Sequence, residues 1–180
     1  FETIELTKGE YFIVSVHREE NVDNPENLRK ILAILNRLAE DYQLPVIVST
    51  HPRTRKHLES LPDLNMDDRI RFLKPFGFTD YVHLQMQSRC AISDSGTISE
   101  ESAILNFPAI SLRNSMERPE AQDSGTIILT GFDPDIVSNS IKTVVREAKH
   151  KTRTIIPNDY QIPDTSWRVL KLIQGLSTLS

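Results

Sequence analysis

A histidine is closely followed by an arginine at two places, each time just after a short apolar run. His17 and Arg18 follow the first run, and His51 and Arg53 follow the second. Near neutral pH an imidazole can act as an acid, a base or a hydrogen-bond donor to phosphate, and a guanidinium can bind phosphate oxygens through two hydrogen bonds. The two pairs predict a site for an anionic ligand. The alternatives are a solvated charged turn at the first pair, and a turn capped by His51 with Arg53 in solvent at the second.

The tetrapeptide 94–97, Asp-Ser-Gly-Thr, lies between an apolar run and a segment with helical character. Gly96 allows the backbone to approach a ligand closely, and the free amides at a helix N-terminus bind phosphate groups. Ser95 and Thr97 can add hydroxyl donors. The segment therefore predicts a phosphate-binding loop, with an ordinary helix N-cap as the alternative.

The same tetrapeptide recurs at 123–126, but a strand pattern follows it instead of a helix. We expect this second copy to be a turn, so the strand-to-helix context carries the prediction for the first copy. A charged segment, 113–120, also follows an apolar run and contains two arginines and two glutamates. Arg118 is the expected ligand group there, and a charged surface loop is the alternative.

Strand and helix patterns alternate along the chain and must position these groups. Asn24 and Pro25 are typical of a helix start, and apolar residues recur at helical spacing after them. We expect strands at 11–16, 45–49, 70–73, 90–93, 109–112 and 126–129, and helices at 25–42, 54–61, 79–87, 98–106, 134–148 and 166–176.

This order predicts an α/β fold with a doubly wound, mostly parallel, Rossmann-like sheet, in which ligands bind at the carboxyl ends of the strands. We expect one domain, 1–180, whose tail, 158–180, carries a helix that can pack on a neighbouring domain.

Composition argues against several other classes of protein. The chain has 21 lysines and arginines against 25 acidic residues, a net charge of -4, and no basic cluster that would follow nucleic acid. Its single cysteine, Cys90, fits a reducing compartment, so we expect a cytoplasmic protein. The sequence has no metal-ligand spacing, no dinucleotide or Walker glycine motif and no apolar run long enough to cross a membrane. We expect no cofactor and no metal.

Taken together, the motifs resemble those of the non-hydrolysing UDP-N-acetylglucosamine 2-epimerases, over roughly Tyr11 to Val145. The resemblance rests on 15–21, on His51-Pro52, on 93–101 and on 117–121. It implies the C-terminal, UDP-binding half of a GT-B architecture, with His17 as the catalytic residue. The positions that match the family's UDP-sugar contacts are Arg18, His51, Tyr81, Ser95, Gly96, Thr97, Glu101 and Arg118.

The resemblance also implies a reaction. The proton at sugar C2 is removed as UDP is eliminated, and UDP is then added back with protonation from the opposite face. The acid and base carboxylates belong to an N-terminal domain that this sequence does not contain, so we expect this chain alone to be inactive. The family further implies a UDP-N-acetylhexosamine substrate and a homodimer.

The chain departs from the family pattern at two positions. Glu19 stands where a second arginine is usual, and Thr97 stands where a second glycine is usual. These changes resemble the branch that forms UDP-N-acetyl-L-fucosamine, a 6-deoxy sugar nucleotide. Two other functions stay open from the sequence, namely a GT-B UDP-sugar glycosyltransferase and a non-catalytic nucleotide-sensing module.

Overall fold

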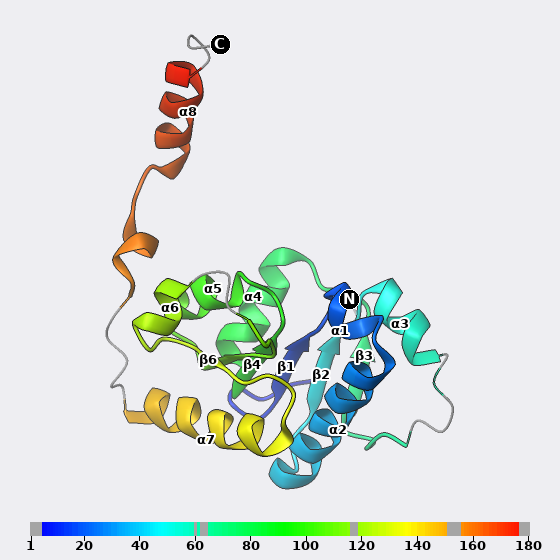
Figure 1. Cartoon of the computed structure of the whole chain (residues 1–180). Helices are drawn as coiled ribbons and strands as arrows, with labels where there is room; N and C mark the ends of the chain where they lie inside the picture. Colours follow the sequence, from blue (N-terminus) through cyan, green and yellow to red (C-terminus); the bar gives the residue numbers. More distant parts are fainter. Residues whose placement is uncertain (1–4, 60, 62–64, 116–118, 151–155, 177–180) are drawn as a thin grey trace.

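Six strands form one parallel sheet in the computed structural model, which describes residues 5–59, 61, 65–115, 119–150 and 156–176. The sheet order is β3-β2-β1-β4-β5-β6 (Figure 1). This is the predicted doubly wound α/β fold. The strands are β1 (Phe12–Ser15), β2 (Val46–Ser49), β3 (Ile70–Leu73), β4 (Cys90–Ser93), β5 (Ala109–Ser111) and β6 (Ile128–Leu129).

The central position of β1 in the sheet explains why its residues form a continuous apolar run and do not alternate between apolar and polar. Phe12 and Val14 pack into one core and Ile13 into another, and all three side chains are fully buried. A strand covered on both faces has no polar face, so it needs a continuous run of apolar residues.

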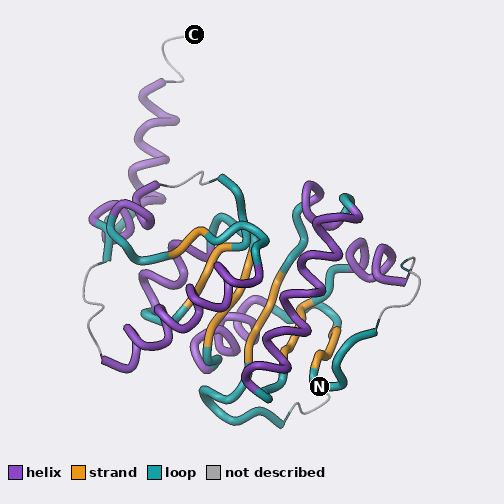
Figure 2. The backbone as a smooth tube through the Cα atoms, turned by 60° about the horizontal axis from the view of Figure 1, so that its bottom comes forward, coloured by secondary structure: helices purple, strands orange, loops and turns teal. Residues whose placement is uncertain are grey.

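Helices cover both faces of the sheet (Figures 1 and 2). Apolar residues of the two long helices α2 and α7 pack into the core with Phe12, and those of α5 pack into the core with Ile13. The helices are α1 (Glu19–Val22), α2 (Pro25–Tyr42), α3 (Pro52–Glu59), α4 (Phe78–Gln87), α5 (Ile98–Leu105), α6 (Pro119–Asp123), α7 (Pro134–His150) and α8 (Thr165–Leu176), with a 3-10 turn at Asn158–Gln161.

Helix α2 begins as its sequence predicts. The side-chain oxygen of Asn24 accepts hydrogen bonds from the amides of Glu26 (2.9 Å) and Asn27 (3.3 Å), and Pro25 is the first helical residue. The helix ends at Tyr42 and is followed by its C-cap, Gln43, which adopts a left-handed conformation with φ 54°.

The structure differs from the sequence prediction in three short elements. Helices α1 and α6 lie in segments for which the sequence predicts no helix. The last strand is shorter than the predicted 126–129, because the amide and hydroxyl of Thr126 both donate to the carbonyl of Ala121 (2.8 and 2.9 Å). Those bonds close a turn after α6, with Gly125 at φ 70°. The second tetrapeptide is therefore a turn, as predicted.

Helix α8 projects away from the body of the domain (Figure 1). All of its residues are exposed, including Trp167, Leu172 and Ile173 at 60–62%. Among the described residues, no helix is long and apolar enough to cross a membrane.

Candidate functional site

The strand order reverses at β1, where β2 pairs on one side and β4 on the other. Ser15 at the end of β1 pairs in register with Ser93 at the end of β4. The segments that follow these two strands therefore meet at one edge, at the switch point where doubly wound sheets bind ligands. They contain His17 and the first tetrapeptide.

A buried carboxylate joins the two segments. Asp94 is fully buried and accepts hydrogen bonds from the amides of His17 (3.2 Å) and Arg18 (3.0 Å) and from the side-chain amide of Asn21 (2.8 Å). These donors come from the segment after β1 and the start of α1. Sequence reasoning gave Asp94 no separate role, since its partners are up to 77 positions away.

The same carboxylate faces the imidazole of His17. Its Oδ1 lies 3.3 Å from Nδ1 of His17, whose side chain is 47% exposed. The two ring nitrogens point in different directions, so Asp94 contacts the imidazole through Nδ1 and not through Nε2. His17 is therefore held by Asp94 at its backbone amide and at one ring nitrogen.

The loop before α5 has hydroxyl groups and amides where the sequence predicts a phosphate site. The Ser95 amide donates to the Ser93 hydroxyl (3.0 Å), and the Ser95 hydroxyl lies 2.9 Å from that of Thr97 and 3.3 Å from the Thr97 amide. Thr97 precedes α5 but makes no side-chain cap. The first-turn amides of α5 are therefore not capped by Thr97, and the Ser95 hydroxyl accepts from the Thr97 amide only.

Glu101 lies in the first turn of α5 and is partly buried. Its Oε2 accepts a 2.9 Å hydrogen bond from the Gln85 side-chain amide on α4. Tyr81, also on α4, packs against the core beneath the site, and its hydroxyl is buried. Burial raises the pKa of Tyr81, and the nearby carboxylates of Glu101 and Asp94 raise it further, whereas the Ser15 side chain lowers it.

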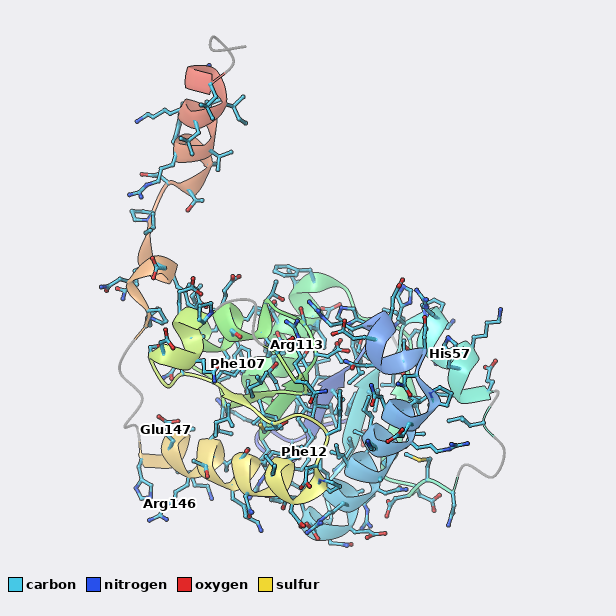
Figure 3. The ribbon with its side chains drawn as sticks, in the orientation of Figure 1. Phe12, His57, Phe107, Arg113, Arg146 and Glu147 are labelled. Carbon is cyan, nitrogen blue, oxygen red and sulfur yellow. The ribbon has the colours of Figure 1, made fainter. Side chains whose placement is uncertain are left out.

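His51 caps α3, as the plainer sequence interpretation proposed, because its Nδ1 accepts from the Arg53 amide (3.3 Å). Arg53 does not extend into solvent alone. Its guanidinium binds Glu19 and both carboxylate oxygens of Asp23, with Nε–Oδ1 at 3.0 Å. His57 adds a contact to Asp23 at 3.1 Å and lies on α3 in Figure 3. Arg53 is therefore bound to acidic groups of the chain itself.

The other arginines named in the sequence analysis differ from one another in their surroundings. Nη1 of Arg18 lies 3.4 Å from Oε1 of Glu20. Arg113 is 4% exposed and lies inside the domain (Figure 3), so it is not part of a charged surface loop. Arg118 lies outside the described residues. In the part of the chain that is described, no cluster of histidine, cysteine and carboxylate side chains could hold a metal ion.

The structure thus places His17, Ser95, Thr97 and Glu101 on segments that meet beside the carboxyl ends of β1 and β4, with His51 after the neighbouring strand β2.

Comparison with known proteins identifies relatives of this chain in sequence and in fold. A curated UDP-N-acetylglucosamine 2-epimerase of Methanococcus maripaludis is 35% identical over 149 residues, which are 81% of this chain and 41% of that protein. The structure of UDP-N-acetylglucosamine 2-epimerase from Rickettsia bellii aligns with a TM-score of 0.81 and 40% identity, over 94% of this chain and 45% of its own.

The Methanocaldococcus jannaschii UDP-GlcNAc 2-epimerase, solved in complex with UDP-GlcNAc and UDP, aligns with a TM-score of 0.79 and 29% identity, over 92% of this chain and 45% of its own. The present chain spans less than half the length of these relatives. A family model described as UDP-N-acetylglucosamine 2-epimerase matches residues 2–174, and the chain therefore belongs to the UDP-N-acetylglucosamine 2-epimerase family.

Proposed function

We propose that this chain is the UDP-binding half of a UDP-N-acetylhexosamine 2-epimerase, an isomerase that inverts C2 of the sugar by eliminating UDP and adding it back. The observation that carries the proposal is the set of contacts made by the buried Asp94 carboxylate. These contacts hold His17 beside the loop that precedes α5. A general acid or hydrogen-bond donor next to an anion-binding helix start suits a reaction whose leaving group is a diphosphate.

In the proposed reaction a base takes the proton from C2 while the bond between C1 and the UDP oxygen breaks. The electron pair of the C1–O bond leaves with UDP, and the electron pair of the C2–H bond forms a C1–C2 double bond in the sugar. Reversal with protonation from the opposite face gives the 2-epimer. The helix-start amides and His17 stabilise the charge that develops on the leaving phosphate oxygens. The carboxylates that move the C2 proton come from the N-terminal domain in this proposal.

Each of the predicted contacts has a role in the proposal. The loop 95–97 holds the diphosphate and Glu101 accepts hydrogen bonds from the ribose hydroxyls. Tyr81 lies near the uracil and His51 lines the sugar-nucleotide cleft. The remaining nucleotide contacts are Arg18 and Arg118.

We further propose a 6-deoxy substrate, with UDP-N-acetyl-L-fucosamine as the product. Two departures from the family pattern, Glu19 and Thr97, support this assignment. Glu19 replaces a positive charge by a negative one close to His17, and Arg53, which pairs with both Glu19 and Asp23, offsets only part of that change. Thr97 adds a hydroxyl and a methyl group to the phosphate loop, which changes the shape of the site.

The missing N-terminal domain is the proposed partner of α8. The exposed apolar side chains of α8, among them Trp167 and Leu172, support contact with another part of the protein. An exposed apolar surface of this kind is typical of an interface. We also propose a homodimer and a cytoplasmic location. A reducing compartment suits the buried Cys90, which forms no disulfide with another described residue.

Calorimetric titration with UDP tests the nucleotide site. We expect the chain to bind UDP and the Ser95→Ala/Glu101→Ala variant to lose that binding. The matched control is Ser124→Ala, the same change in the second tetrapeptide, which should bind UDP as the wild type does. Absence of binding to the wild-type chain at millimolar UDP would contradict a nucleotide site built by this chain.

Product analysis of the full-length protein then tests the reaction. Incubation with UDP-N-acetylhexosamines, with and without a 6-deoxy group, should give the C2 epimer without any acceptor. Transfer that requires an acceptor would support the glycosyltransferase instead. UDP binding with no turnover of any sugar nucleotide would support the sensing module.

A further inference from the structure

Gln85 has a buried polar side chain that lies directly under the proposed ribose-binding carboxylate. It lies in the last turn of α4 and is 1% exposed. Its Nε2 donates to Oε2 of Glu101 at 2.9 Å. A carboxylate can only accept, so this contact fixes which end of the amide faces Glu101.

The fold alone does not account for a glutamine at this position. The Oε1 atom of Gln85 is buried and has no hydrogen-bond partner among the described residues. A buried acceptor without a partner destabilises the folded state, and an apolar side chain of similar length would avoid that cost. Polar residues that the fold does not need are characteristic of functional sites.

We propose that Gln85 is a positioning residue for nucleotide binding, and that it acts by orienting Glu101. The proposal rests on the proposed function, in which Glu101 binds the ribose hydroxyls. The hydrogen bond holds Oε2 of Glu101 against α4 and leaves Oε1 for the ligand. A carboxylate held in one rotamer before binding loses less conformational freedom when the ribose arrives, so it binds more tightly.

Titration with two nucleotides separates this role from a general effect on the fold. UDP has both ribose hydroxyls, and 2′,3′-dideoxy-UDP has neither. We expect Gln85→Met to weaken UDP binding about tenfold, the scale of one hydrogen bond to a charged group, and to leave dideoxy-UDP binding within about twofold. Glu101→Gln gives the full size of the ribose effect.

Gln87→Met is the matched control, because it makes the same change on the same helix at a partly buried side chain. It should keep the wild-type ratio of the two affinities. Gln85→Asn is a second test variant, since it keeps the amide but withdraws it by one methylene. Thermal melting should show Gln85→Met folded, with a melting temperature equal to or above that of the wild type.

Each outcome decides the proposal. A lower UDP to dideoxy-UDP affinity ratio in both Gln85 variants supports it. If the ratio of the two affinities stays unchanged, whether or not both nucleotides bind more weakly, the role of Gln85 is overturned and the proposed function is left intact. Equal affinities in the wild type overturn the role of Glu101 and, with it, that of Gln85. A wild-type chain that binds neither nucleotide contradicts the proposed nucleotide site itself.

Discussion

Replacement of Asp94 should destabilise the whole domain, because its carboxylate is the acceptor for three donors from the segment after β1. Asp94→Ala would leave the amides of His17 and Arg18 and the side chain of Asn21 without that acceptor. A buried donor without a partner costs about 1–3 kcal/mol. Asn21 is 3% exposed, whereas water can reach the two backbone amides in part.

We therefore expect Asp94→Ala to lower the free energy of unfolding by about 3–5 kcal/mol, with the larger share from Asn21. For a domain of this size that loss corresponds to a melting temperature roughly 10 °C lower. Asp94→Asn keeps the shape and one acceptor oxygen, and it should lose about half as much.

Urea unfolding followed by circular dichroism measures these values. Asp68→Ala is the control, because Asp68 is an exposed turn residue, and its loss should change stability by less than about 0.5 kcal/mol. If the free energy of unfolding of Asp94→Ala lies within about 1 kcal/mol of the wild-type value, the buried carboxylate does not hold the two segments together and the reasoning fails.

Two further predictions concern the hydrogen bonds of single side chains. Tyr11 donates to the carbonyl of Leu84 at 2.7 Å, and burial raises the pKa of Tyr11 from 10.0 to about 12. The unfolded chain releases this proton first, so stability is full below pH 10 and falls towards pH 12. Urea unfolding at several pH values should show a flatter decline for Tyr11→Phe, and parallel curves would contradict the assignment. Asn24→Ala removes the cap of α2 and should cost about 1 kcal/mol, or roughly 2–4 °C in melting temperature. Asn139→Ala, an exposed change within α7, should cost less, and equal losses would show that capping is not the cause.

The sequence predicts the sheet and the long helices well because their signals are local. An apolar run such as 12–15 and a helix start such as Asn24-Pro25 are read within a few residues. Helices α1 and α6 contain only 4 and 5 residues, which is too short for helical periodicity to be visible. The sequence therefore predicts no helix in either segment.

The candidate site is predicted less completely, since its geometry depends on how distant strands align. His17 and the loop 95–97 could be chosen by residue type and by their place after strands. The role of Asp94 depends on the register of β1 against β4, and the contact between Gln85 and Glu101 depends on how α4 packs beside α5. No spacing along the chain encodes either contact.

The pairing of β1 with β4 also has a consequence for the order of folding. Phe12 pairs with Cys90, whereas the other strand pairs join segments much closer in sequence. Contacts between distant segments require closure of a long loop and form slowly. Because the contacts of Asp94 straddle this pair, the site can exist only after the two halves of the sheet have met. A ligand bound there selectively stabilises chains that have completed that step.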